Sequence, residues 1–169
     1  MSDRQFEQRG QQWLEEFLKL ANLSAPVTTE IRETFSETSC WLTIDDSALT
    51  PDQIEALIGT QGVAIDSIQY LANSTLNLGK QEDQQGAYTI ELAGYRQRRQ
   101  QELLEIAEQA AEQVRQSGKE YEIKSLSSAE RRQIHTILKD SPDLETYSRG
   151  QEPDRRLVVQ PAKSDEPSA

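Results

Sequence analysis

Two glycines, Gly59 and Gly62, constrain the fold of this chain most, because they separate two segments of helical character. Before them, Thr50-Pro51-Asp52 supplies a capping hydroxyl, a proline at the first helical position and an acid in the first turn. After them, apolar residues recur at helical spacing from about 63 to 76. Four residues between two helices force a sharp turn, which glycine accommodates. We therefore predict a helix, a tight turn at 59–62 and a second helix.

Shorter segments flank this helical pair. Residues 3–21 carry apolar side chains at helical spacing and predict an amphipathic helix. Residues 27–35 and 40–44 predict the two strands of a hairpin around a turn at 36–39, and residues 88–92 predict a further strand. The first half of the chain should therefore run helix, strand, strand, helix, glycine turn, helix, strand.

The second half begins with a long helix from Gly94 to about Ser117, and Gly118 is a natural stop. The elements expected after it are a strand at 121–123, a helix from Ser127 or Ser128 to about Lys139, and paired strands at 144–148 and 155–160. We predict an α+β protein with a first domain at 1–93, a small α/β domain at 94–161, and a disordered tail at 162–169.

The net charge of −11 argues against a nucleic-acid ligand, but the charge is unevenly distributed. Residues 1–92 hold 5 Lys/Arg and 15 Asp/Glu, whereas residues 93–161 hold 12 of each. Arginines cluster in the second half at 96–99, 131–132 and 149–156. Because local clusters bind phosphates, the second half is the better candidate for a nucleic-acid surface.

Other features of the sequence restrict the class of protein. No segment approaches the roughly 20 apolar residues that cross a bilayer, and the first ten residues lack the apolar core of a secretory signal. Cys40 is the single cysteine, so an internal disulfide is excluded. We find no acid pair, nucleophile–base set or nucleotide loop with a lysine that would indicate an enzyme. We expect a cytoplasmic, non-enzymatic protein without a membrane association, a metal or a cofactor.

The element order of the first half resembles the type II KH fold, whose GxxG loop clamps single-stranded nucleotides. The resemblance implies that Gly59, Thr60, Gln61 and Gly62 contact the sugar-phosphate chain, which approaches glycines closely and faces the amides of the next helix. KH loops often carry a basic residue at the two middle positions, whereas this loop has Thr60 and Gln61. A KH fold used for protein pairing is therefore the alternative.

Arg131 and His135 form a second candidate site. They are four residues apart, so both should project from one face of a helix, where a guanidinium and an imidazole can donate to a phosphate. His135 is the only histidine, which excludes a multi-histidine metal site. The alternative interpretation is an exposed Arg/His pair without a ligand.

Residues 94–161 resemble the Arg-x-x-x-His (R-3-H) domain of the bacterial Jag (SpoIIIJ-associated) family. The resemblance rests on four stretches, which are Gly94-Tyr95-Arg96-x-Arg98-Arg99, Ser128-Ala129-Glu130-Arg131-Arg132-x-Ile134-His135, Thr146-Tyr147-Ser148-x-Gly150-x-Glu152-Pro153 and Arg155-Arg156-Leu157-Val158-Val159-x-Pro161. It implies a KH domain directly before the R-3-H domain, in a short form without the Jag N-terminal domain. It also implies RNA binding, post-transcriptional control and a link to cell elongation or division. Pairing with a small stand-alone KH protein is a further implication.

Carried onto this sequence, Arg131 and His135 are the defining pair of the site. Its neighbours should be Arg132, Ser148 and Arg156, the last preferred over Arg155 because adjacent strand residues point to opposite faces. The function that we expect is binding of single-stranded RNA, with single-stranded DNA as a second ligand and self-association as a second mode of pairing. The alternative function is a protein-interaction adaptor with the same two folds and little RNA affinity.

Overall fold

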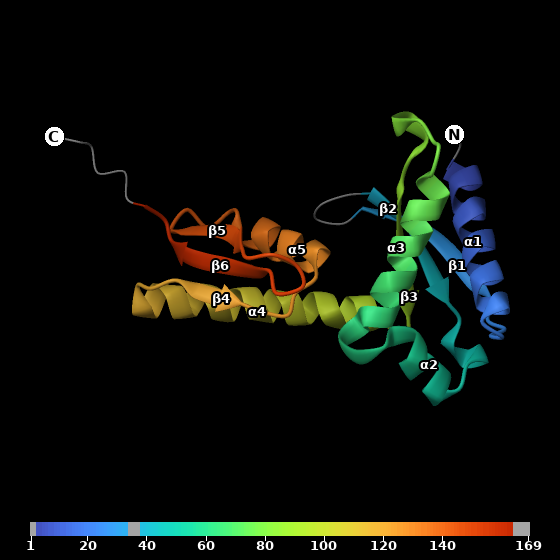
Figure 1. The fold of residues 1–169 in the computed structure, drawn as a ribbon, viewed down its shortest axis with the longest axis horizontal. Coiled ribbons are helices and arrows are strands. Elements are labelled where there is room, and N and C mark those ends of the chain that lie inside the picture. The colour runs from blue at the N-terminus through green and yellow to red at the C-terminus, as the bar shows by residue number, and fades with distance from the viewer. Residues whose placement is uncertain (1–2, 34–37, 164–169) are drawn as a thin grey trace. The chain divides into compact units, whose positions relative to one another are not determined.

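The structure is a computed structural model that describes residues 3–33 and 38–163 (Figure 1). In chain order its helices and strands are α1 (Asp3–Leu20), β1 (Val27–Glu33), β2 (Thr38–Ile44), α2 (Pro51–Ile58), α3 (Val63–Asn77), β3 (Ala87–Leu92), α4 (Tyr95–Ser117), β4 (Tyr121–Ile123), α5 (Ser128–Leu138), β5 (Leu144–Arg149) and β6 (Arg156–Pro161). The chain divides into two compact units after Gln97, near the start of α4. The domain limits proposed from the sequence, at 93 and 94, stay a prediction.

The N-terminal unit, up to Gln97, contains a three-stranded sheet in the order β1-β2-β3. β1 and β2 pair antiparallel from Val27–Ile44 to Glu33–Thr38, which confirms the predicted hairpin. Residues 36 and 37 of the predicted turn lie outside the described residues. β3 pairs parallel to β2, so the chain must cross over between them through α2 and α3. The predicted order of elements is the order observed.

The core of this unit lies between the sheet and its helices. Along β2, the alternate residues Cys40, Leu42 and Ile44 are buried, and they belong to one apolar cluster with side chains of α1, α3 and β3. Helix α1 packs so closely against Tyr88 that only glycine fits at position 10. A Cβ there would lie 2.5 Å from the ring of Tyr88. Burial raises the pKa of the Cys40 thiol to about 11. Cys40 is therefore a protonated, unreactive core residue.

The C-terminal unit, from Arg98, contains an antiparallel sheet in the order β4-β6-β5. The predicted pairing of the last two strands is confirmed, with Leu144 opposite Pro161 and Arg149 opposite Arg156. One face of β6 presents Leu157 and Val159 to α4 and α5. The core that forms there consists of Leu103, Ala107, Ala110, Ala111, Val114, Ile123, Leu126, Ile134, Leu138, Leu144, Leu157 and Val159.

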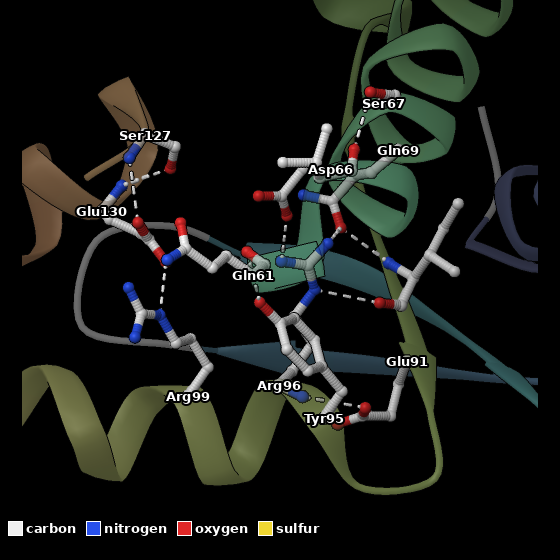
Figure 2. Close-up of polar contacts among 12 residues, drawn as sticks. Gln61, Asp66, Ser67, Gln69, Glu91, Tyr95, Arg96, Arg99, Ser127 and Glu130 are labelled. Carbon is white, nitrogen blue, oxygen red and sulfur yellow. Dashed lines mark hydrogen bonds and ion pairs between the residues drawn. The ribbon is translucent and has the colours of Figure 1, made fainter. Parts of the chain in front are cut away.

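Helix α5 starts where the sequence predicted, and a capping box fixes its first turn. The Ser127 hydroxyl accepts a hydrogen bond from the Glu130 amide at 3.2 Å, and the Glu130 carboxylate accepts one from the Ser127 amide at 2.9 Å. Arg99 of α4 donates its Nε–H to the same carboxylate at 2.7 Å (Figure 2). The helix that carries Arg131 and His135 is therefore anchored to α4 at its first turn.

Two further observations bear on the whole chain. In the part that the structure describes, no helix combines the length and apolar character that a membrane crossing requires. From residue 164 onward, the predicted tail lies outside the described residues.

Candidate nucleic-acid interface

A pocket of about 400 Å³ lies between α5 and the β5–β6 hairpin of the C-terminal unit. Helix α5 contributes side chains from successive turns of one face, and the hairpin contributes both strands and the loop that joins them. The lining residues are Ser128, Arg131, Arg132, His135, Thr146, Tyr147, Ser148, Glu152, Arg155 and Leu157. Four residues predicted from the sequence, Arg131, Arg132, His135 and Ser148, thus line a single pocket.

Arg131 lies at the base of this pocket, because its side chain is only 5% exposed. Its guanidinium donates to the carbonyl of Leu126 at 2.7 Å and to that of Arg155 at 3.4 Å. It also forms an ion pair with Glu152. These bonds tie α5 to the preceding loop and to the β5–β6 loop. The interpretation of Arg131 and His135 as an exposed pair is therefore wrong for Arg131, whose donors serve the fold.

His135 differs from Arg131, because it is exposed at the rim of the pocket. Its Nδ1 is hydrogen-bonded to the hydroxyl of Thr146 in β5. This bond fixes the orientation of the ring and leaves Nε2 as the nitrogen that can meet a ligand.

Arg132 and Arg155 are exposed side chains that line the pocket without an acidic partner among the described residues. Most arginines of the C-terminal unit are ion-paired, including Arg99, Arg115, Arg131, Arg149 and Arg156. Two guanidiniums with unused donors beside His135 form a group that suits an anion such as phosphate.

The structure does not bring Arg156 to this pocket. Its guanidinium donates to Glu122 of β4 at 2.8 Å on the opposite face of the sheet. Arg155 precedes the strand, and its side chain lines the pocket instead. We expected the two arginines to point to opposite faces of the sheet. The sequence does not show which face packs against α5, and so it did not show which of the two lies at the pocket. Arg155 is the better candidate.

An ion-pair network covers this opposite face of the sheet. Glu122 accepts hydrogen bonds from Arg156 and Arg149, and both lower the pKa of its carboxyl group. Arg149 also pairs with Glu120, and its guanidinium lies 5.4 Å from the ring centroid of Tyr147. The arginines of this face are thus neutralised by acids of the same chain.

The Gly59–Gly62 loop lies in the N-terminal unit, between α2 and α3. Gly59, Gln61 and Gly62 all have positive φ, with values of 74°, 54° and 76°. A Cβ at Gly62 would overlap the hydroxyl of Tyr95, and a Cβ at Gly59 would lie 2.7 Å from that of Ala64. Both glycines are therefore required by the fold of the loop itself.

Residues at the start of α4 support this loop (Figure 2). The Tyr95 hydroxyl donates to the carbonyl of Gln61 at 3.4 Å. Arg96 donates to Asp66 at 2.6 Å and to Gln69 at 3.0 Å, both in α3. The nearby carboxylate of Glu91 accepts from the Arg96 amide at 3.0 Å. Arg96 thus forms a structural ion pair with Asp66. The two middle positions of the loop, Thr60 and Gln61, are uncharged.

Three pocket residues that contact Arg131 or His135 were not selected from the sequence, namely Glu152, Thr146 and Arg155, the last of which was considered but ranked below Arg156. Each lies in a stretch that carried the family resemblance, so the motif itself was the available signal. Their contacts with Arg131 and His135 join residues 11 to 24 positions apart, and no periodicity reveals such pairs. In the described ranges, no group of three His, Cys, Asp or Glu side chains could hold a metal ion.

Comparison with known proteins agrees with this geometry. Residues 101–161 match the model of the R-3-H domain, so the match contains α5 and the whole pocket. The chain is also similar to proteins named RNA-binding protein KhpB. The identity is 28% with the protein of Clostridium symbiosum, over 88% of this chain and 63% of the relative. It is 28% with that of Bacillus subtilis, over 66% and 53%, and 33% with that of Lactiplantibacillus plantarum, over 61% and 31%.

These findings define the class of protein first: the C-terminal unit contains an R-3-H domain in a mixed helix and sheet fold. They also agree with the resemblance seen in the sequence, because the R-3-H match and the similarity to the KhpB proteins both support a protein of the Jag type. The chain spans less than two thirds of the length of these relatives.

Proposed function

We propose that this protein binds single-stranded RNA, and that the pocket between α5 and the β5–β6 hairpin is its main contact. The observation that carries the proposal is the convergence of the unpaired Arg132 and Arg155 with His135 on one pocket. Neither arginine has an acidic partner among the described residues, and two guanidiniums gathered with an imidazole on one pocket suit an anionic ligand. The name RNA-binding protein, which the relatives bear, supports RNA as that ligand.

In this proposal the pocket contacts the phosphate and sugar of one or two nucleotides. Arg132 and Arg155 donate to phosphate oxygens, and Nε2 of His135 and the hydroxyls of Ser128 and Ser148 complete the donor set. Such contacts carry little sequence information, so affinity should depend strongly on salt. Single-stranded DNA has the same phosphates and is the second expected ligand.

The test measures the affinity of the full chain for a short single-stranded RNA at low salt, by fluorescence anisotropy. We expect the double variant Arg132→Ala/Arg155→Ala to bind at least about 10-fold more weakly, because two charge-assisted contacts are lost. The matched control is Lys119→Ala/Lys139→Ala, which removes the same charge from exposed positions that do not line the pocket. An absence of wild-type binding, or equal losses in both variants, would contradict the proposal.

We also propose that the N-terminal unit is a KH-type domain whose loop adds a weaker RNA contact. Support comes from the element order and from the backbone of Gly59–Gly62, whose Gln61 carbonyl accepts a hydrogen bond from Tyr95. Thr60 is exposed, so Thr60→Asp adds a repulsive charge without altering a glycine. In the same assay it should weaken binding by less than the double variant does. A role in post-transcriptional control linked to cell elongation or division rests on the family resemblance alone.

A second candidate function is protein pairing, which the outer face of α3 favours. Val63, Tyr70 and Leu71 are 63%, 73% and 47% exposed, and Ser67 and Ser74 separate them on the same face. This face carries no charge in a unit with an excess of acids, so two copies can meet there without like-charge repulsion. We infer self-association through α3; a stand-alone KH protein, as the resemblance implies, would compete for the same face.

Light scattering with size-exclusion chromatography tests this pairing. The wild-type chain should show a dimer at high micromolar concentration, and Tyr70→Ser/Leu71→Ser should be monomeric. The control Tyr121→Ser changes an exposed aromatic residue in the other unit and should leave the dimer intact. A wild-type chain that stays monomeric at every concentration would exclude self-association.

A further inference from the structure

Glu152 is an unexpected lining residue, because it places a carboxylate in a pocket whose other charged groups are cations. Its side chain is 59% exposed, and it lies on the β5–β6 loop beside Arg155. A carboxylate repels phosphate, so its presence lowers the affinity of the pocket for a plain anion. Because one of its oxygens is paired with Arg131, the carboxylate can still accept through the other from a ligand that has hydrogen-bond donors as well as a phosphate.

The ion pair with Arg131 holds one oxygen of this carboxylate against the base of the pocket. Arg131 is itself immobilised, because it is buried and bonded to the carbonyls of Leu126 and Arg155. Glu152 Oε1 accepts from the guanidinium, while Oε2 has no partner among the described residues. Oε2 is therefore an acceptor that a ligand can meet, on a side chain that lines the same pocket as Arg132 and Arg155.

From this geometry we infer that Glu152 is a specificity-determining residue that selects guanine in the bound RNA. The inference rests on the proposed function. The Watson–Crick edge of guanine carries two adjacent donors, N1–H and the N2 amino group, and a carboxylate accepts from both. Single-stranded RNA exposes this edge, because its bases can be splayed out of the stack. The phosphate of the same or the next nucleotide then meets Arg132 and Arg155.

The other three bases fit this acceptor less well. Adenine and cytosine each offer one amino group, but the neighbouring ring nitrogen is an acceptor that a carboxylate repels. Uracil offers N3–H between two carbonyl oxygens, which are also repelled. Guanine alone presents two donors side by side without an acceptor between them, so it should bind more tightly than each of the others.

The first arm of the experiment changes the RNA and leaves the protein intact. Oligouridylates with a single central guanosine, adenosine or cytidine are compared with plain oligouridylate by fluorescence anisotropy. We expect guanosine to bind about 10-fold more tightly, as one good bidentate contact allows. Inosine lacks the N2 amino group and should lose most of this gain. The control base 7-deazaguanosine keeps both donors and should bind as guanosine does.

The second arm changes the protein at a single polar atom. Glu152→Gln keeps an amide oxygen that can accept from Arg131, so the fold should persist, which circular dichroism verifies. Its amide nitrogen replaces an acceptor and should bring guanosine and inosine to equal affinity. The matched control Glu145→Gln alters an exposed acid of β5 that does not line the pocket, and the guanosine preference should survive.

The outcomes separate this inference from the proposed function. If no RNA binds at low salt, both are overturned. If RNA binds but guanosine and inosine are equivalent on the wild-type protein, the guanine inference fails and the phosphate pocket stands. A guanosine preference that is unchanged in a folded Glu152→Gln variant also overturns the role of Glu152. If that variant is unfolded, the comparison of guanosine, inosine and 7-deazaguanosine on the wild type decides.

Discussion

Two adjacent arginines in α5 have opposite roles, because consecutive helical residues point in different directions. Arg131 is buried and bonded to two carbonyls and Glu152, whereas Arg132 is exposed and lacks an acidic partner among the described residues. Arg131 therefore stabilises the fold of the pocket, and Arg132 is available to a ligand. Loss of RNA binding in an Arg131 variant would not by itself show contact with RNA.

A comparison of single alanine variants separates these roles. Arg131→Ala leaves the buried Leu126 carbonyl unsatisfied, so it should destabilise the C-terminal unit by about 2 kcal/mol. Arg132→Ala should change stability by less than about 0.5 kcal/mol and still weaken RNA binding. Hydrogen–deuterium exchange of peptides from α5 and β6 measures the difference. Similar protection in the two variants would show that the buried bonds of Arg131 contribute little.

From the sequence, only those site residues could be predicted that belong to a recognisable motif or lie at a helical spacing. Arg131, Arg132 and His135 follow from the Arg-x-x-x-His stretch and Ser148 from the stretch that begins at Thr146, and all four line one pocket. The burial of Arg131 was not predictable, because a four-residue spacing shows a shared helix face but not how deeply that face lies. The acid that pairs with it, Glu152, is 21 residues away on another element.

At the scale of elements, the N-terminal sheet contains two ionisable side chains that its fold keeps protonated. Cys40 in β2 and Tyr88 in β3 are direct partners in the parallel pair. Burial raises the pKa of Cys40 to about 11 and that of Tyr88 to about 12. In the unfolded chain both groups lose their protons nearer their ordinary values of 9.0 and 10.0.

This difference predicts alkaline destabilisation of the N-terminal unit. The stability from protonated Cys40 is complete below about pH 9 and is lost as the pH rises toward 11, at about 1.4 kcal/mol per pH unit. Cys40→Ala should flatten this decline, whereas Tyr70→Phe, a change at an exposed tyrosine, should not. Urea unfolding followed by tryptophan fluorescence reports on this unit, because Trp13 and Trp41 both lie in it. An unchanged decline in Cys40→Ala would contradict the argument.

The elements themselves were largely predictable, because capping and periodicity are local. Thr50 and Ser127 cap α2 and α5 as their sequences indicate, and each helix starts within one residue of its prediction. Strand β2 begins earlier than expected, at Thr38, since pairing with β1 and β3 extends a strand into polar residues. The parallel pairing of β2 and β3 depends on the crossover, which no local pattern specifies.

At the scale of the whole molecule, the charge is distributed unevenly between the two halves of the chain. The first 92 residues have an excess of ten acids, whereas residues 93–161 are neutral overall and include the pocket. Within the second unit, acids neutralise the arginines of one sheet face, whereas Arg132 and Arg155 line the pocket without an acidic partner in the described part of the chain. This selective pairing is the feature that supports RNA binding in an acidic protein.

The most direct test of this account is the salt dependence of RNA affinity, which counts phosphate contacts. For single strands, the logarithm of the affinity falls with the logarithm of the salt concentration by about 0.7 per neutralised phosphate. The slope for Arg132→Ala/Arg155→Ala should therefore be shallower than that of the wild type by about 1.4, while Lys119→Ala/Lys139→Ala keeps the wild-type slope. Identical slopes for all three proteins would show that Arg132 and Arg155 do not contact phosphate, and would contradict the assignment of the pocket.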